Sequence, residues 1–488
     1  MSNQMLILLA LIIPSAMAVL GPLIGEKRAN LREAATLTAS VALFAVVFSL
    51  LRQVYQGETL PDVILAQPID ALPFMLRIDA IGIAFASLAS FLWILTTLYS
   101  IGYMRGAGEK HQSRFYACFA IAIAATMGLA FSGNMLTLFL FYEILTVSTY
   151  PLVAHKGNDK ARAGARTYLG ILLATSIGFQ LIAILATWYL TGTLDFTDGG
   201  IMEGKVSHAV GAILLVLYIY GIGKAALMPF HRWLPAAMVA PTPVSALLHA
   251  VAVVKAGVFT VIKVMVFIFG LDYVKELFTG DFLLYMAAFT VLAASIVAMR
   301  QDNLKSRLAY STVSQLSYII VGAMLLSQYA AIGAGMHMVM HAFGKITLFF
   351  CAGAIYVATK KTEVSQLDGL GRRMPFTMGA FLLGALCVIG VPPMGGLWSK
   401  WHLFIGAYDT GHLLIVGVLM LSTLLNIAYL LPPVIRAFLM PPADNKAVNG
   451  IAEAPLFCVV PLCLTALGCI ALFFLAAPLH TLLSGMFP

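Results

Sequence analysis

The chain reads SALLHAVAVVKAGVF from Ser245 to Phe259, so a histidine and a lysine stand in an otherwise almost wholly apolar run. The run continues with few polar residues to Phe269. It is long enough to cross the hydrocarbon core of a bilayer, which needs about 20 apolar residues. No acidic residue near in sequence can pair with Lys255, so its partners must come from other segments of the fold.

The composition places the whole chain in the same class. The 488 residues are 61% hydrophobic and 10% charged, whereas a soluble domain carries roughly 25% charged residues. We predict an all-α polytopic membrane protein without a sizeable soluble domain. The N-terminal apolar stretch is predicted to be a retained first span, because no Lys or Arg precedes it as in a cleaved signal peptide.

About fourteen segments have the length and apolarity of transmembrane spans. They are residues 4–24, 33–52, 79–103, 115–132, 134–154, 164–191, 208–230, 243–269, 282–299, 308–326, 330–358, 376–400, 412–435 and 456–478. The segment 53–78 is predicted to be a polar connector.

The loops between these spans alternate in charge. Twenty of the 29 Lys and Arg residues fall on one side of the predicted membrane, and four fall in loops on the other. The basic loops are residues 25–32, 104–114, 155–166, 231–242, 300–307, 359–375 and 436–455. Cytoplasmic loops carry the Lys and Arg excess, so we expect both termini to face away from the cytoplasm.

Five basic side chains and one acidic side chain remain inside the predicted spans. They are Lys224, Lys255, Lys263, Lys345, Lys400 and Glu143. A charge at mid-bilayer costs about 2.5–3.5 kcal/mol on insertion scales, so each group must face protein, water or another charge. One acid cannot neutralise five lysines, and a lysine that alternates between its charged and neutral forms can carry a proton. The sequence therefore favours a proton relay.

Two structural alternatives stay open for these charges. Lys263 lies late in its span and can extend its ammonium group to the headgroups. Glu143 can form a buried salt bridge with Lys224 or Lys255 that serves only structure.

The segment MHMVMHAFGKITLFF spaces His337, His341 and Lys345 by four residues, which places them on one helix face. The H-x-x-x-H spacing also suits a metal. However, Met338 replaces the glutamate of H-E-x-x-H and no Cys or carboxylate accompanies the pair, so we predict no metal site. His249 and Lys255 lie about 120° apart around an ideal helix, and we expect them to contact different neighbours.

Two spans carry helix breakers beside a lysine. Lys224 precedes Pro229 in YGIGKAALMPFHRWLP, and Pro392 and Pro393 precede Lys400 in CVIGVPPMGGLWSKWHLF. Broken helices in corresponding places of two halves are typical of inverted-repeat transporters, although the Pro-Pro pair can also simply shape a loop.

We therefore predict two inverted five-helix repeats, spans 4–8 and 9–13, in which helices 7 and 12 are broken. The expected units are 1–112 for spans 1–3, 113–269 for the first repeat, 270–435 for the second and 436–488 for span 14.

The sequence contains no G-x-G-x-x-G, no P-loop and no cysteine framework for iron–sulfur. We expect no bound cofactor and no catalytic residue. The six cysteines lie in apolar segments and are interpreted as packing residues. The basic excess encodes orientation, so we expect no nucleic-acid partner.

Three segments together resemble a known family. They are MPFHRWLPAAMVAPTPVSALLHAVAVVKAGVF, DNLKSRLAYSTVSQLSYI and GVPPMGGLWSKW. They are similar to the antiporter-like subunits shared by respiratory complex I, group 4 membrane-bound hydrogenases and Mrp-type multisubunit Na⁺/H⁺ antiporters, and they are most similar to the D subunit of the Mrp type. The form GLWSKW departs from the GF..K that is usual in the Mrp D subunit and is closer to the hydrogenase-type relatives.

The resemblance implies roles residue by residue. It marks seven groups for proton translocation: Glu143, Lys224, His249, Lys255, His337, His341 and Lys400. Lys345 is predicted as an eighth, because it shares the helix face of His337 and His341. The resemblance also implies a switchable ion pair between Glu143 and Lys224, and partners that are other membrane subunits of a hetero-oligomeric complex in a bacterial cell (inner) membrane.

Three functions follow as hypotheses. The first is a proton-translocating subunit of a monovalent cation/proton antiporter, such as a sodium transporter, which is not an enzyme by itself. The second is the proton-pumping arm of a complex I-like dehydrogenase or a membrane-bound hydrogenase. The third is a scaffold that holds partners and transports nothing.

Overall fold

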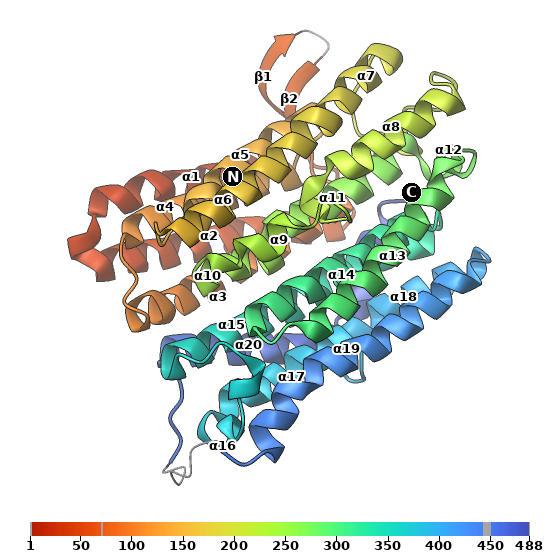
Figure 1. Cartoon of the computed structure of the whole chain (residues 1–488). Helices are drawn as coiled ribbons and strands as arrows, with labels where there is room; N and C mark the ends of the chain where they lie inside the picture. The colour runs from red at the N-terminus through yellow and green to blue at the C-terminus, as the bar shows by residue number, and fades with distance from the viewer. Residues whose placement is uncertain (1, 70–71, 443–449, 488) are drawn as a thin grey trace.

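The computed structural model describes residues 2–69, 72–442 and 450–487. Long helices run side by side in one bundle (Figure 1). The helices that run without interruption are α1 (Asn3–Ile24), α2 (Ala29–Tyr55), α3 (Ala80–Gly106), α4 (Gln112–Ala130), α5 (Met135–Val153), α13 (Thr279–Arg300), α14 (Leu304–Met324), α15 (Gln328–Thr359), α19 (Leu413–Leu439) and α20 (Leu456–Phe474).

Four of the predicted spans are built from shorter pieces. Span 6 is α6 (Asp159–Thr175), the π-helical turn η2 (Ser176–Leu181) and α7 (Ile182–Thr191). Span 7 is α8 (His208–Gly221), the 3-10 turn η3 (Gly223–Ala225) and α9 (Trp233–Ala236). Span 8 is α10 (Thr242–Ala246), η5 (Leu247–Val251), α11 (Val253–Lys263) and η6 (Val264–Phe269), and span 12 is α17 (Pro375–Ile389) and α18 (Gly396–Asp409).

The remaining elements are short. They are η1 (Glu26–Arg28), η4 (Ala237–Val239), α12 (Leu271–Lys275), η7 (Val364–Gln366), α16 (Leu370–Arg373) and α21 (Ala476–Ser484).

Each of the fourteen predicted spans coincides with a helix or a broken helix. Within the described residues, eleven helical segments are long and apolar enough to cross a membrane, and His208–Gly221 and Pro375–Ile389 are shorter apolar helices. Those two are the first halves of the broken spans 7 and 12. The predicted all-α, multi-pass membrane fold is confirmed.

The two breaks occur where the prolines and glycines indicate them. Span 7 opens between Gly221 and Trp233, and Lys224 lies within the η3 turn. Span 12 opens between Ile389 and Gly396. Both breaks contain a cis peptide bond before a proline, Met228–Pro229 in one and Pro392–Pro393 in the other.

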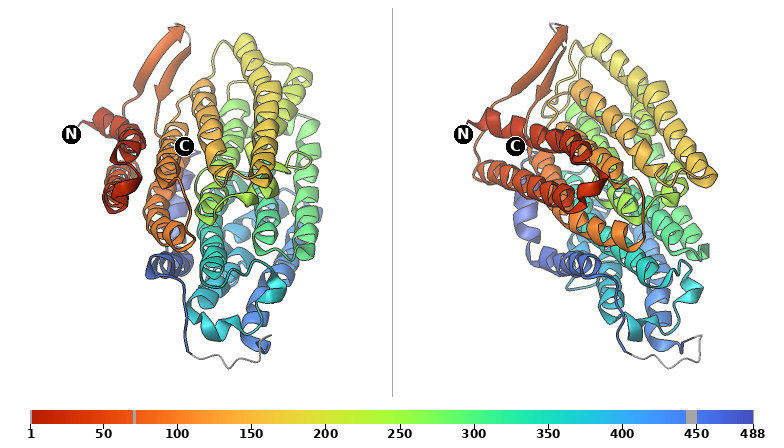
Figure 2. Two further views of the ribbon diagram at one scale, coloured as in Figure 1. Left: turned by 60° about the vertical axis from the view of Figure 1, so that its left-hand side comes forward. Right: turned by 90° about the vertical axis from the view of Figure 1, so that its left-hand side faces the viewer.

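The segment predicted as a polar connector contains a β-hairpin. Strand β1 (Val63–Ile69) pairs antiparallel with β2 (Leu72–Leu76), with Val63 opposite Leu76. Both strands are short and include a proline, so the sequence offers only a weak alternation signal. Figure 2 shows the hairpin projecting beyond the helix ends.

The basic loops gather at one end of the bundle. We call this end the basic face; it carries α16, whereas the hairpin and α12 lie at the opposite end (Figure 1). Lys446 belongs to the last basic loop and lies outside the described residues.

The two predicted repeats correspond to α4 through α11 and to α13 through α19, and the fourth helix of each is broken. The second helix of each repeat starts alike: the side chain of Asn134 caps α5 at the Thr137 N–H, and that of Asn303 caps α14 at the Ser306 N–H. Because each predicted repeat has five spans, the two repeats start on opposite sides of the membrane, as inverted repeats require.

Two elements form the centre of the bundle. The most apolar stretches of Thr242–Phe269 and of α15 are completely buried, whereas those of α1, α2 and α20 are no more than a third buried. The central elements carry His249, Lys255 and the α15 histidines, so the polar groups lie deep in the protein rather than against lipid.

Candidate functional site

The structure buries seven of the eight predicted site residues. Glu143 is half-buried, and the buried residues are Lys224, His249, Lys255, His337, His341, Lys345 and Lys400. They come from both predicted repeats, and three of them lie on the central helix α15. The groups share the interior of the bundle, so the question is which of them touch.

A direct contact joins the two central elements. The Lys255 Nζ lies 2.6 Å from the His341 Nδ1. Lys255 thus finds on α15 the partner that its own segment lacks. This distance allows a hydrogen bond between the amine and the imidazole, and either group can donate it, depending on protonation and tautomer.

The contacts continue along α15. The rings of His337 and His341 stack with their centroids 5.9 Å apart, as their spacing of four predicts. The His337 Nδ1 lies 2.9 Å from the Ser399 Oγ, and its Nε2 lies 3.2 Å from the Gln315 Oε1. We call this row of contacts, from Lys255 through His341 and His337 to Ser399, the polar axis. Ser399 immediately precedes Lys400, so α18 contributes to the polar axis at this point.

Lys345 leads away from the axis toward α14. Its Nζ donates to the Ser311 Oγ at 2.5 Å and to the Leu308 carbonyl oxygen at 3.5 Å. The third member of the α15 face therefore contacts α14 and forms a side branch of the axis.

His249 has a different environment from Lys255, as predicted. It lies in the π-helical turn η5, and its ring packs on Phe349 with centroids 4.6 Å apart. Within the described part of the chain, both of its ring nitrogens are buried without a hydrogen-bond partner. A buried polar group without a partner is costly, so this imidazole is free to accept a new contact.

Lys224 is enclosed by α5. Its Nζ donates to the Tyr142 carbonyl oxygen at 2.8 Å and to the Thr146 Oγ1 at 2.5 Å, and it lies 3.0 Å from the centroid of the Tyr142 ring. Gly257 of α11 packs against the same turn, because a Cβ there would lie 2.3 Å from the Ala225 nitrogen.

The expected ion pair between Glu143 and Lys224 differs from the observed geometry. Among the described residues, no salt bridge within 4 Å joins the two. The Oε1 of Glu143 is buried without a partner. The ammonium turns to the face of α5 that carries Tyr142 and Thr146, while residue 143 lies about 100° around the helix from Tyr142.

Lys400 occupies a similar pocket in the second repeat. Its Nζ donates to the Ile389 carbonyl oxygen at 2.9 Å and to the Thr423 Oγ1 at 3.4 Å, and it lies 5.0 Å from the centroid of the Tyr318 ring. The Tyr318 ring also stacks on His337, with centroids 5.6 Å apart. Lys400 is thereby connected to the axis through one aromatic ring.

The axis is continuous from Lys255 to the neighbourhood of Lys400 and interrupted before Lys224. No hydrogen bond within the described residues links Lys224 to Lys255. The elements that carry them touch through Gly257, two residues after Lys255. The site therefore consists of a linked part on α11, α15 and α18 and a separate lysine pocket on η3 and α5.

Lys263 is paired. Its ammonium forms a hydrogen-bonded ion pair with Asp79, and it lies 3.9 Å from the centroid of the Phe196 ring and 4.5 Å from that of Phe267. Asp79 also caps α3, and an Asp directly before an apolar helical run is a helix-start signal. That signal identifies the cap, although nothing in the sequence joins it to Lys263.

Sequence reasoning missed the uncharged members of the site. Gln315, Tyr318 and Ser399 connect His337 to α14 and α18. No group of three or more His, Cys, Asp or Glu residues within the described chain is placed to hold a metal ion, and the six cysteines are free.

Comparison with known proteins gives a family match over most of the bundle. Residues 132–426 match the family described as NADH:quinone oxidoreductase/Mrp antiporter, transmembrane. The chain is 33% identical over 411 residues to NADH-quinone oxidoreductase subunit N of Desulforudis audaxviator, which covers 81% of each chain.

Two longer relatives match over a part of their length. A probable K(+)/H(+) antiporter A/B subunit of Rhizobium meliloti is 34% identical over 70% of this chain and 33% of its own. An NAD(P)H-quinone oxidoreductase chain 5 of Synechocystis is 32% identical over 66% of this chain and 48% of its own.

Two solved structures share the fold over 99% of this chain and 96% of their own. A chain of the Mrp complex from Dietzia superposes with a TM-score of 0.85 at 20% identity. A chain of an archaeal membrane-bound sulfane sulfur reductase superposes with a TM-score of 0.86 at 24% identity.

Proposed function

The chain belongs to the NADH:quinone oxidoreductase/Mrp antiporter family of transmembrane subunits, and from this premise we propose that it is a proton-translocating subunit of a multisubunit monovalent cation/proton antiporter. It acts as a transport subunit rather than an enzyme on its own. Its partners are other membrane subunits, the bilayer, protons and a monovalent cation such as Na⁺ or K⁺. The assignment to the D subunit within the family remains a prediction.

One observation carries this proposal: titratable groups of two central helices touch in the middle of the bundle. Lys255 and His341 are 2.6 Å apart, and His341 stacks on His337, which contacts Ser399. A proton on the Lys255 amine passes to the His341 imidazole when a neighbouring charge disfavours the ammonium form. Both groups are buried, and charges interact more strongly in the protein interior than in water, so a charge added nearby has a large effect on this transfer.

The two lysine pockets serve as the ends of this axis. Lys224 changes its charge in response to Glu143, whose carboxylate oxygen without a partner is free to move toward it. Lys400 exchanges protons with one bulk phase through the opening of span 12. His249, Lys345 and the remaining polar groups adjust the charge that Lys255 and His341 experience.

We further propose that the basic face is cytoplasmic and that both termini face away from the cytoplasm of a bacterial cell (inner) membrane. The charge alternation of the loops supports this orientation. Labelling of single cysteines at the exposed positions 27 and 278 by an impermeant maleimide in intact cells tests it. The variant at position 278 is expected to label and the variant at 27 to be protected; the reverse pattern contradicts the orientation.

The function is tested by transport in membrane vesicles that contain the whole complex. Lys255→Met, Lys224→Ala and Glu143→Ala are expected to lower cation-driven dissipation of a pH gradient at least tenfold, at unchanged complex abundance. Lys275→Met is the matched control, because Lys275 is exposed and pairs with Asp272 at the end of the bundle away from the basic face. Unchanged exchange in Glu143→Ala and Lys224→Ala would overturn the proposal.

A redox-driven complex is the second candidate. The superposition on a chain of a sulfane sulfur reductase complex and the GLWSKW sequence favour it, because the same axis can move protons when a separate subunit transfers electrons. Mass spectrometry of the complex purified with its partners separates the two. Iron–sulfur and catalytic subunits indicate the redox complex, whereas small membrane subunits alone indicate the antiporter.

A further inference from the structure

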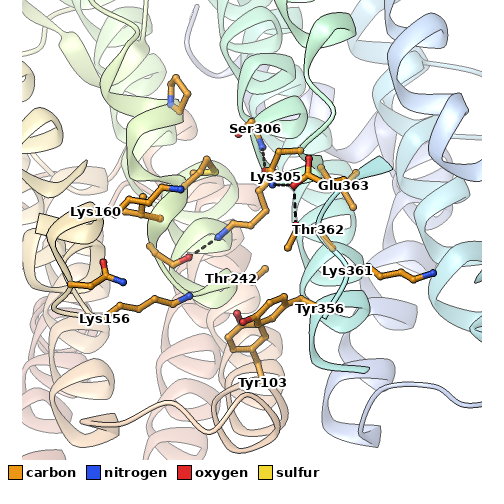
Figure 3. Close-up of a pocket in the computed structure, with 18 residues that line it drawn as sticks. Tyr103, Lys156, Lys160, Thr242, Lys305, Ser306, Tyr356, Lys361, Thr362 and Glu363 are labelled. Carbon is orange, nitrogen blue, oxygen red and sulfur yellow. Dashed lines mark hydrogen bonds between the residues drawn. The ribbon is translucent and has the colours of Figure 1, made fainter. Parts of the chain in front are cut away.

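A cavity on the basic face lies apart from the lysine and histidine axis. Its volume is about 640 Å³, and it opens between the α5–α6 connection, the η4 turn, the first turn of α14 and the end of α15 (Figure 3). None of the eight predicted proton-translocation residues lines it. The cavity is large enough for a small organic ligand, which typically occupies 300–1,000 Å³.

Three lysines from separate parts of the chain point into this space. Figure 3 shows Lys156 reaching in from the α5–α6 connection, Lys160 from the first turn of α6 and Lys305 from α14. Lys305 donates to the Ala240 carbonyl oxygen at 2.6 Å. Lys156 lies 5.9 Å from the centroid of the Tyr356 ring. Within the described chain, no hydrogen bond or ion pair engages the ammonium groups of Lys156 and Lys160.

The nearby acids do not neutralise these lysines. Glu363 lines the cavity, but its Oε1 accepts hydrogen bonds from the Asn303 Nδ2 and the Thr362 hydroxyl, each at 2.9 Å. Burial raises the pKa of the Glu109 carboxyl, and the charges of Lys156, Lys305 and Lys360 oppose that shift. Among the described lining residues, Glu363 is the single carboxylate against Lys156, Lys160, Lys305 and Lys361, so the cavity carries a net positive charge even though burial lowers the pKa of Lys305 to about 7.

We propose that this cavity binds a phosphate-bearing anion. A phosphate group carries up to two negative charges and three acceptor oxygens, and lysine binds it as a point charge from several directions. Tyr103, Thr242 and Tyr356 line the wall and supply hydroxyl groups beside apolar surface. Basic pockets between transmembrane helices on the cytoplasmic side suit phospholipid headgroups, and a soluble phosphate presents the same chemistry.

Two probes distinguish the sources on the purified complex in detergent. Inorganic pyrophosphate is titrated by isothermal calorimetry, and dioleoyl phosphatidylglycerol is added to delipidated complex and counted by native mass spectrometry against dioleoyl phosphatidylcholine. Binding of pyrophosphate identifies a soluble anion, whereas selective retention of phosphatidylglycerol without pyrophosphate binding identifies a lipid headgroup. Either result supports the site if it depends on the lysines.

The dependence is tested with Lys156→Gln/Lys160→Gln. Removal of two charges is expected to weaken binding about 30-fold, at roughly a factor of five for each lysine. Lys27→Gln/Arg28→Gln removes the same charge from the same face outside the cavity and is expected to change binding less than twofold. Lys305→Gln, assayed for the same probes, gives a further single-residue check.

The proposal is overturned if neither probe binds at one per chain, if the Lys156/Lys160 variant binds as tightly as the wild type, or if the control weakens binding equally. A thermal unfolding curve of each variant shows that it is folded. The readout is binding, so it is independent of whether the chain transports protons.

Discussion

The two lysines of the broken helices lie in pockets made from the same parts. Each ammonium donates to one main-chain carbonyl and one threonine hydroxyl and faces one tyrosine ring, which is Tyr142 for Lys224 and Tyr318 for Lys400. The carbonyl of the Lys224 pocket comes from another helix, α5, whereas that of the Lys400 pocket is Ile389 of its own broken span. The second repeat thus holds its lysine by a local contact that leaves its tyrosine ring free to stack on His337.

The pockets also differ in charge. Glu143 stands nine residues after the cap Asn134 of α5, and the residue nine after the cap Asn303 of α14 is Thr312. The Thr312 hydroxyl donates to the Leu308 carbonyl oxygen of its own helix. One repeat therefore carries an acid on its second helix, and the other carries a threonine at the corresponding position. Two lysine pockets with similar hydrogen bonds can therefore differ in the charged groups that act on the lysine.

The largest expected effect comes from removing either lysine. Lys224→Met and Lys400→Met should each lower proton transport at least tenfold, because a series path fails when any member cannot carry the charge. The double variant should be no worse than the worse single variant, since residues that act as a unit are not additive. Initial rates in vesicles, normalised to complex abundance, measure this.

Partial and additive losses would contradict the series arrangement. If each single variant kept about half the rate and the double variant lost all of it, the two pockets would act as parallel routes. Lys275→Met, with its exposed ion pair to Asp272, controls for the loss of one lysine.

The next largest effect tests whether the charge of Glu143 acts on residue 224. Lys224→Glu places a second carboxylate beside Glu143, and like charges in a buried site disfavour ionisation and weaken the fold. Lys400→Glu meets no acid at the corresponding position of its repeat, because residue 312 is a threonine. We therefore expect Lys400→Glu to keep about a tenth or more of the wild-type rate and Lys224→Glu to fall well below that, by the same vesicle assay.

Complex abundance in the membrane reports the stability part of this prediction. Equal rates and equal abundance for the two variants would show that Glu143 does not act on residue 224.

A smaller effect is expected when the acid is neutralised in place. Glu143→Gln keeps the size of the side chain and removes the charge that favours the ammonium form of Lys224. The rate should fall several-fold, and the pH at which transport is half-maximal should decrease, because a lysine without its acid holds its proton less tightly. The pH profile of exchange measures the shift.

Thr312→Val is the matched control at the corresponding position of the second repeat. It should leave the pH profile unchanged, because Thr312 carries no charge and its hydroxyl donates within its own helix. A shift of equal size in both variants would show that the profile reports packing rather than charge.

The sequence predicted the class of the fold well because the solvent imposes it. Apolar length identifies spans, and the prolines and glycines around Lys224 and Lys400 identify the two breaks. The hairpin at Val63–Leu76 and the π-helical turn that carries His249 were missed. Neither has a distinctive local signal, because a π-helical turn uses the same apolar residues as the helix around it.

The candidate site was predictable only where it is charged. A buried lysine is conspicuous because it costs free energy in an apolar span. Gln315, Ser399 and Thr423 are polar but uncharged, and such residues occur in many spans, so their role follows from contacts alone. The partner of Lys263 was missed for the same reason, since Asp79 is distant in sequence and reads as a helix cap.

The smallest expected effect separates the two threonines. The Thr146 Oγ1 lies 2.5 Å from Lys224, whereas the Thr423 Oγ1 lies 3.4 Å from Lys400. A hydrogen bond to a charged group contributes about 1.5–3 kcal/mol when it is well formed, and a long one contributes much less. Thr146→Val leaves the Tyr142 carbonyl oxygen as an acceptor for Lys224, so it should lower the rate only about threefold, and Thr423→Val should lower it less than twofold. Valine keeps the branched shape, so a loss in both variants of equal size would show that the two pockets are alike in strength and that the difference in distance has no functional consequence.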